Sequence, residues 1–569
     1  MIRSTARHAA CLLVLASIAP AAFAQRPITR TTPPESAVDA IFKRYDSKDT
    51  PVCSVAVIDD GKVLLKKSYG MADVALGVPR TSATSHYIPY SEARVFVALA
   101  VAMLVRDGKV SWDDPVRKYI PQVPPYASAV TVRQLLHHTS GLADYGVLDP
   151  GLESMWTRLS EDEFFRALAR WNKLGFAPGT SKMYSNTDYA LLQMLVARVS
   201  GGSLHDYLHG KLLGPLGMKD TRIGADQTLV HAGHALFHTP DGEGFRRVFP
   251  YRSDPVGGIS VTTSLDDLIR WEAALRDPAR GLSAALEQME AGAPPPVPDA
   301  GANARDLAFG VFRSTYKGLP LVAHHGVGGY AYLVQVPDTR LSVATLCNAY
   351  GDMQTMGPDV AHLYVASAAP EAATPAPVIG PVVDVAASEL QRFVGEYRAP
   401  TGQYFDIAIA GRGLQITPRG GSAMPVALPV GDGQFRADFP DGSTYLLTFQ
   451  PDGADMVMGA LDVAKNMPDG PGLRRSSTPA WATAKTFAAY PGIYVGDDVD
   501  STLHVRVEDG RVLMATRGRA EIAMQPGPKP DHFVRWDIYD PRFERDASGR
   551  VVALVLDATR VKGMRYTKK

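Results

Sequence analysis

The last third of the chain contains an internal repeat, and this repeat limits the possible folds more than any other feature. The pattern Leu-x-x-Phe-x-Gly-x-Tyr at residues 390–397 recurs as Phe-x-x-Tyr-x-Gly-x-Tyr at residues 487–494. Sixteen residues after each final tyrosine stands a glycine, Gly413 or Gly510, ahead of another apolar run. Both copies are almost entirely strand-like. We therefore predict two small all-β barrel-like domains of roughly 90 residues each.

The part of the chain before this repeat is predicted to form one mixed α and β domain. A chain of 569 residues exceeds what a single core can bury, which indicates two to four domains. Residues 367–386 are rich in Ala and Pro and have the composition of a linker. We expect a mixed domain over 25–366, the first β module over 387–475 and the second over 480–569.

Within the mixed domain, strands surround a helical middle. Two β-rich runs flank Asp60-Gly61, which is typical of a hairpin turn. Residues 161–174, EDEFFRALARWNKL, have apolar positions at helical spacing and acids in the first turn. Strand-like runs return over 320–350. This order predicts an α+β domain with an antiparallel sheet and a helical part.

The first 24 residues have the features of a secretory signal. Arg3 and Arg7 precede an apolar run over 9–21, and Ala22-Phe23-Ala24 is a small-x-small cleavage site. The run is short for a membrane span, and no later run is long enough. We expect cleavage after Ala24 and a periplasmic or secreted protein.

Charge and cysteine content exclude some partners. Lys plus Arg and Asp plus Glu both number 59, so the sequence has no basic excess that would favour binding to nucleic acid.

Cys53 and Cys347 remain after cleavage, each in a strand-like run. An exported protein permits a disulfide, but we interpret the two as buried free thiols. We expect no metal and no organic cofactor; a metal site at His231, His234 and His238 is a minority interpretation against ordinary surface histidines.

Ser91 is the first candidate for chemistry. It precedes a long apolar run at the expected start of a helix, where free N–H groups favour an anion. A lysine three residues after a serine could remove its proton from the same helix face. The residue there is Arg94, which stays protonated and cannot be the general base. Alone, Ser-x-x-Arg is a weak motif, and most such serines are helix caps.

Two further elements could complete a site. Tyr184-Ser185-Asn186 stands in a turn before an apolar helix, and positive charge from Arg94 would help Tyr184 act as a base. The alternative is a turn tyrosine with a capping asparagine. His324-His325-Gly326 ends a strand, and the Val327 N–H with that of Ser91 could form an oxyanion hole. The alternative is a hairpin with incidental histidines.

Together these elements resemble the serine β-lactamase-related hydrolases, of the branch near class C β-lactamases, D-aminopeptidases and carboxylesterases. The resemblance covers residues 36 to 366. It includes the segments VSWDDPVRKYIPQVP, VTVRQLLHHTSGLADY, FAPGTSKMYSNTDYALL, LLGPLGMKDT and VGGISVTTSLDDLIRW, in the family's order. The two C-terminal modules resemble the lipocalin-like domains appended to such hydrolases. The implied fold is a penicillin-binding-protein-like domain followed by two barrel-like domains.

The resemblance also implies roles. Ser91 matches the acylated nucleophile, and Tyr184 the tyrosine that assists proton transfer. Asn186 matches a substrate-orienting amide, while His324 and Gly326 match the third, substrate-binding motif. The implied partner is a small-molecule or peptide substrate; oligomeric state is not implied.

Three departures separate this sequence from the family pattern. Arg94 replaces lysine, and Tyr90 replaces a small residue. The third motif is one residue short between His324 and Tyr330. Lys182 is a possible replacement base, whereas Ser314-x-x-Lys317 lies in a strand-like segment where i and i+3 do not share a face. Two hypotheses follow: a slow hydrolase of an ester, amide or D-amino-acid peptide, or an inactive homologue that binds a peptide or cell-wall fragment. In the second, Arg94 would hold a carboxylate.

Overall fold

The computed structural model describes most of the chain. The described residues are 29–88, 93–148, 160–224, 231–241, 244–248, 260–291, 306–307, 311–316, 319–325, 331–349, 353–366, 379–398, 404–418, 423–431, 433–438, 444–452, 455–462, 467–468, 472–475, 481–516, 521–527, 529–534, 539–558 and 561–569. The signal segment therefore lies outside them. Within them, no helix is both long and apolar enough to cross a membrane.

A seven-stranded antiparallel sheet forms the centre of the mixed domain, in the order β11-β12-β13-β14-β15-β2-β3. Its strands are β2 (Cys53–Asp59), β3 (Lys62–Ser68), β11 (Asp306–Leu307), β12 (Val311–Tyr316), β13 (Leu319–His325), β14 (Ala331–Val336) and β15 (Leu341–Cys347). Strand β15 pairs with β2, so segments from both ends of the domain share one sheet. The predicted hairpin is confirmed, because Asp60 and Gly61 take the positive φ angles of a tight turn between β2 and β3.

Helices cover both faces of this sheet. Helices α1 (Glu35–Phe42) and α10 (Met353–Leu363) share an apolar cluster with alternate strand residues such as Val55 and Val343. On the other face, α8 (Leu265–Arg276) packs on β2 and β15. The other helices of this part are α2 (Arg94–Arg106), α3 (Val132–Leu136), α4 (Tyr145–Leu148), α5 (Glu161–Trp171), α6 (Asn186–Ser200), α7 (Leu204–Leu208) and α9 (Leu282–Ala291), with shorter helical turns at η1 (Lys43–Tyr45), η3 (Val116–Lys118), η4 (Pro125–Ala127), η5 (His209–Leu213, a π-helix), η6 (Pro278–Arg280) and η7 (Pro337–Thr339).

Short strands pair with one another outside the seven-stranded sheet. They are β1 (Thr29–Arg30), β4 (Met71–Asp73), β5 (Val78–Pro79), β6 (His86–Ile88), β7 (Arg222–Ile223), β8 (Phe237–Asp241), β9 (Gly244–Val248), β10 (Val261–Thr263) and β16 (Val365–Ala366). Helix α5 shows how local sequence sets a helix. Ser160 and Glu163 form a capping box at its start, and Asn172 ends it in the left-handed conformation. The seven-stranded sheet and the helices that cover both of its faces confirm the predicted α+β fold.

Each copy of the repeat forms a curled antiparallel sheet. The first contains α11 (Ala387–Leu390), η8 (Gln391–Phe393), β17 (Gly395–Arg398), β18 (Tyr404–Ala410), β19 (Gly413–Pro418), β20 (Leu428–Gly431), β21 (Gln434–Asp438), β22 (Thr444–Asp452), β23 (Asp455–Asp462), β24 (Met467–Pro468) and β25 (Leu473–Arg475). The second contains α12 (Ala484–Phe487), β26 (Gly492–Gly496), β27 (Thr502–Glu508), β28 (Arg511–Thr516), β29 (Ile522–Pro526), β30 (Phe533–Val534), β31 (Tyr539–Arg545), β32 (Val551–Ala558) and β33 (Val561–Lys568). Residues 379–386 carry no helix or strand, and Val383 N–H donates to the Pro429 carbonyl of β20 (2.9 Å).

The repeated tyrosines and glycines make the same contacts and take the same backbone conformation in both modules. The Tyr397 hydroxyl donates to the Phe393 carbonyl (3.0 Å), and the Tyr494 hydroxyl donates to the Tyr490 carbonyl (2.7 Å). Both tyrosines are fully buried. The glycine two positions before each tyrosine has a φ angle near +150°, a region that other residues avoid. The sequence repeat thus corresponds to the same local structure at the first strand of each sheet.

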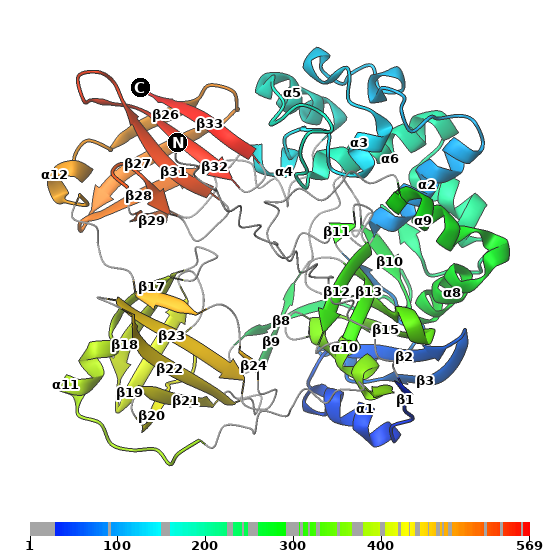
Figure 1. Cartoon of the computed structure of the whole chain (residues 1–569), viewed down its shortest axis with the longest axis horizontal. Coiled ribbons are helices and arrows are strands. Elements are labelled where there is room, and N and C mark those ends of the chain that lie inside the picture. The colour runs from blue at the N-terminus through cyan, green and yellow to red at the C-terminus, as the bar shows by residue number, and fades with distance from the viewer. Residues whose placement is uncertain are drawn as a thin grey trace, which may run out of the picture.

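The second module packs against the helical part of the mixed domain. Figure 1 shows its strand β33 beside α4 and α5. Lys173 Nζ lies 2.9 Å from Asp498 Oδ2, and Arg170 Nη1 lies 2.8 Å from Asp500 Oδ1. These pairs are exposed, so they fix orientation more than they stabilise the contact.

The interpretation of Cys53 and Cys347 as free thiols is wrong. The two residues face each other across the β2–β15 pair and form a disulfide. They are 294 positions apart in the chain, and both are fully buried. Strand register brings them together, and spacing along a sequence does not reveal register.

Candidate functional site

The candidate site is built around a buried arginine at the start of α2. This helix is almost entirely Ala, Val, Leu, Phe and Met between its terminal arginines, and it lies in the interior against α6, α7 and α9. Arg94, its first residue, is only 1% exposed. A permanently charged group at such a position requires partners close by.

Asn186 provides the polar contact. It is the first residue of α6, and Arg94 Nη2 donates to its Oδ1 atom (2.9 Å). The other side of the amide donates to the Asp144 carboxylate, with Nδ2 at 3.2 Å from Oδ1 and 3.1 Å from Oδ2. Asp144 is fully buried, so Asn186 bridges a buried cation and a buried anion. The two charges balance each other across one amide group.

Two aromatic rings also lie close to Arg94. The guanidinium carbon lies 4.4 Å from the centre of the Tyr184 ring and 5.3 Å from that of Tyr189. Both distances are within the range of cation–π attraction. The structure therefore brings three predicted site residues together: Arg94, Tyr184 and Asn186. With its guanidinium facing Asn186 and the two rings, Arg94 is placed to position these groups and is poorly exposed for holding a ligand carboxylate.

The loop that carries Asp144 is fixed to the start of α6. Thr187 Oγ1 donates to the Ala143 carbonyl (2.6 Å) and accepts from the Tyr145 N–H (2.9 Å). The Gly146 N–H donates to Asp144 Oδ1 (2.9 Å). The carboxylate thus receives hydrogen bonds from both its own loop and α6, which sets its distance from Arg94.

A second buried polar cluster supports the Tyr184 turn. His138 has a left-handed φ of 56°, and its ring centre lies 4.8 Å from that of Tyr184. Its Nδ1 accepts from the Ser185 N–H (3.3 Å) and lies 2.9 Å from Asp188 Oδ2. Burial raises the pKa of Asp188 well above its usual value, and the Ser140 hydroxyl donates to its other oxygen (2.5 Å). Burial thus favours the protonated, uncharged form of the Asp188 carboxyl group.

The imidazole of His137, the histidine before His138, is a weak base. Burial lowers the pKa of His137 to about 4, and the positive charge of Lys182 adds to this effect. His137 is thus neutral near pH 7. Ser314 lies on β12, as its strand-like segment predicts, while Lys317 lies outside the described residues. Within the described part of the chain, no three His, Cys, Asp or Glu side chains are grouped to hold a metal.

The remaining predicted residues are placed differently. His324 lies on β13 opposite Leu333 of β14, and it lines a cavity with Gln335 on the face covered by α8 and α9. Ser91, Tyr90, Gly326 and Val327 lie outside the described residues, so their predicted roles stay predictions. Ser91 precedes Arg94 by three positions in the sequence.

Sequence reasoning missed Asp144 and Asp188. Both lie in segments that carry the family resemblance, in SGLADY and SNTDYALL. The signal available was an acid within an otherwise apolar or small-residue stretch before or inside a helix. Burial of both carboxylates depends on how α6 meets the loop, and this tertiary contact has no local sequence pattern.

Comparison with known proteins identifies the family of the mixed domain. The family model described as Beta-lactamase matches residues 38–366. The chain belongs to the beta-lactamase family. A D-aminopeptidase of Cereibacter sphaeroides (strain KD131 / KCTC 12085) is 26% identical over 355 residues, covering 60% of this chain and 64% of that protein. Penicillin-binding protein 4* of Bacillus subtilis (strain 168) is 29% identical over 187 residues, covering 33% of this chain and 41% of that protein.

This beta-lactamase-family chain thus spans less than two thirds of the length of these curated relatives. Among solved structures, the octameric penicillin-binding protein homologue from Pyrococcus abyssi superposes with a TM-score of 0.51 at 24% identity. The match covers 78% of this chain and 99% of that one. The likeness shows a shared fold, in agreement with the predicted architecture.

Proposed function

We propose that this beta-lactamase-family serine hydrolase cleaves an ester, an amide or a D-amino-acid peptide, and that it does so slowly. The Ser91 hydroxyl oxygen attacks the carbonyl carbon, the leaving group departs with a proton, and water then hydrolyses the acyl ester. Tyr184 takes the serine proton. The observation that carries the proposal is the cluster of Arg94, Tyr184 and Asn186 at the start of α2.

Arg94 keeps the positive charge and the asparagine contact of the site but cannot accept a proton. Loss of a general base typically costs about 10²- to 10⁴-fold in rate. Asn186 has its Oδ1 bonded to Arg94 and its Nδ2 bonded to Asp144, so its amide is held in one orientation for a substrate. The D-aminopeptidase relative supports the substrate class.

Arg94→Lys tests this proposal, with hydrolysis of p-nitrophenyl esters and D-amino-acid p-nitroanilides as the readout. We expect kcat/KM to rise by about tenfold or more, because lysine can act as the base. Arg133→Lys, an exposed arginine paired with Asp113, is the matched control and should leave the rate unchanged. A rate that Ser91→Ala does not reduce would remove the nucleophile from the proposal.

The second candidate function is that of an inactive homologue binding a peptide or cell-wall fragment. The observation favouring it is the permanent charge of Arg94 in the position of the base. Calorimetric titration of D-alanyl-D-alanine peptides into wild type tests it. Saturable binding without turnover over days would favour the binder, whereas slow release of D-alanine would favour the hydrolase.

We also propose that the protein is exported, to the periplasm or out of the cell, with cleavage after Ala24. The disulfide between Cys53 and Cys347 supports this, because disulfides persist mainly in oxidising compartments. N-terminal sequencing of the exported fraction should begin at Gln25. Recovery of chains that begin at Met1 would contradict cleavage.

A further inference from the structure

A cavity lies at the far end of α2 from the candidate site. Its volume is about 730 Å³, and it is bordered by the C-terminal half of α2, the π-helix η5 and helix α9. Arg94 and Met103 are nine residues apart on α2, which corresponds to roughly 13 Å along a helix. The cavity is therefore separate from the cluster around Asn186.

Most of the residues that line the cavity are apolar. Leu99, Leu212, Leu282 and Met289 contribute buried side chains, and Trp112 closes one side. A volume of several hundred Å³ with a mostly apolar lining and a few polar groups is typical of a small-molecule site. Gln288 is the one uncharged polar side chain among the described lining residues.

The charged side chains that line this cavity are all basic. Arg106, Lys211 and Arg280 line it, and no carboxylate is among the described lining residues. Arg106 Nη2 lies 3.1 Å from Asp107 Oδ1, and Arg280 Nε lies 3.2 Å from Asp277 Oδ2. Both carboxylates lie within three residues of the arginine that they contact, in pairs that solvent screens. Each guanidinium has further N–H donors for a ligand.

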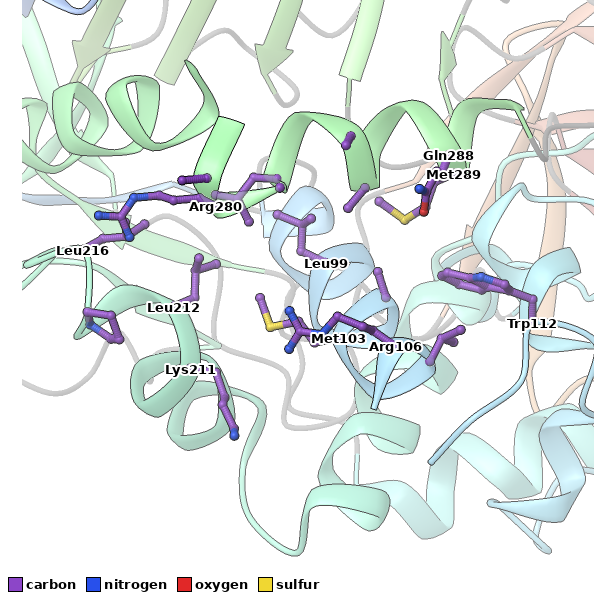
Figure 2. A pocket seen from close by; sticks show the side chains of 18 residues that line it. Leu99, Met103, Arg106, Trp112, Lys211, Leu212, Leu216, Arg280, Gln288 and Met289 are labelled. Atoms are coloured by element: carbon purple, nitrogen blue, oxygen red, sulfur yellow. The ribbon is translucent and has the colours of Figure 1, made fainter. Parts of the chain in front are cut away.

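The three cations are gathered in one half of the cavity. Figure 2 shows Arg280, Arg106 and Lys211 around one half of the cavity, while Trp112 and Met289 lie toward the other. A ligand that satisfied both halves would carry an anionic head and an apolar tail. Neither a neutral apolar molecule nor a small inorganic anion would use both.

We propose that this cavity binds a long-chain carboxylate, with the head group at Arg106, Lys211 and Arg280 and the alkyl chain along α2 toward Trp112. The site is independent of the proposed hydrolase activity, because none of its residues belongs to the Arg94 cluster. Charge complementarity selects the head, and burial of methylene groups binds the tail.

Calorimetric titration of the full chain with dodecanoate, below its micelle concentration, tests the proposal. We expect one saturable site, about tenfold weaker binding of decanoate, and weaker binding of dodecanol, which lacks the charge. Lys211→Glu with Arg280→Glu should weaken dodecanoate binding by about tenfold or more. The matched control, Lys485→Glu with Lys562→Glu on the second β module, should leave it unchanged.

Two further variants complete the test. Ala285→Trp fills the cavity and should abolish binding, with an unchanged circular dichroism spectrum as evidence of folding. Ser91→Ala should bind dodecanoate as wild type does, so the failure of either proposal can be seen apart from the other. Equal affinity for dodecanol and dodecanoate, an equal loss in the control variant, or no saturable binding would each overturn the proposal.

Discussion

The bridge from Arg94 through Asn186 to Asp144 predicts energetic coupling between two charges that do not touch. Arg94 is 1% exposed and Asp144 is fully buried, so neither charge is compensated by water. Asp144→Asn keeps the shape but removes the anion that Asn186 and Gly146 donate to. Leaving one member of a buried pair uncompensated typically costs about 3–5 kcal/mol. We expect about 3 kcal/mol here, because the charges interact through an intervening amide.

Arg94→Gln should cost a similar amount, since it leaves Asp144 as the uncompensated charge. The double variant should then be less destabilised than the sum of the two, by about 1–3 kcal/mol. Hydrogen exchange measured by mass spectrometry on peptides from α2 and α6 gives the local opening free energies. Asp113→Asn, in the exposed pair with Arg133, is the control and should cost less than about 1 kcal/mol. Additive effects of the two substitutions would refute the bridge.

Three further predictions concern the supporting structure. Because burial raises the pKa of Asp188, the contribution of this carboxyl group to folding stability is complete below pH 4 and is lost as pH rises toward the folded-state pKa. Asp188→Asn keeps one donor and one acceptor at this position. Thermal unfolding of the variant should therefore show a smaller loss of Tm between pH 4 and pH 8 than wild type. A strongly destabilised Asp188→Asn at every pH would instead indicate a charged pair. Cys347→Ser should lower unfolding stability by about 2–4 kcal/mol, and non-reducing peptide mapping of wild type should recover the linked peptides. Gly395→Ala, at a φ of 147°, should destabilise the first β module by about 1–3 kcal/mol in denaturant unfolding, whereas Gly459→Ala, with open space around it, should not.

The sequence was sufficient for the architecture because its strongest signals are local and repeated. The repeated residue spacing predicted the two C-terminal sheets. The structure gives the reason for the repeat, because the Tyr397 and Tyr494 hydroxyls each donate to the backbone carbonyl four residues earlier. The capped helix at Ser160 and the turn at Asp60 follow from side-chain chemistry within a few residues. These features require no knowledge of distant contacts.

The residues that sequence reasoning missed depend on contacts between distant segments. Asp144 becomes a partner of Arg94 only because its loop is bonded to the first turn of α6. Cys347 meets Cys53 through strand register. In each case the partner is set by packing across the fold, so residue type and spacing along the chain were insufficient to identify it.

We propose that Ser91 is an activated nucleophile even though Arg94 occupies the position of the base. Intact mass after incubation with a fluorophosphonate, and separately with a penicillin, tests it directly, with Ser91→Ala alongside. We predict a mass increase of one adduct in wild type and none in the variant. No adduct in wild type, or an equal adduct in both proteins, would contradict the account.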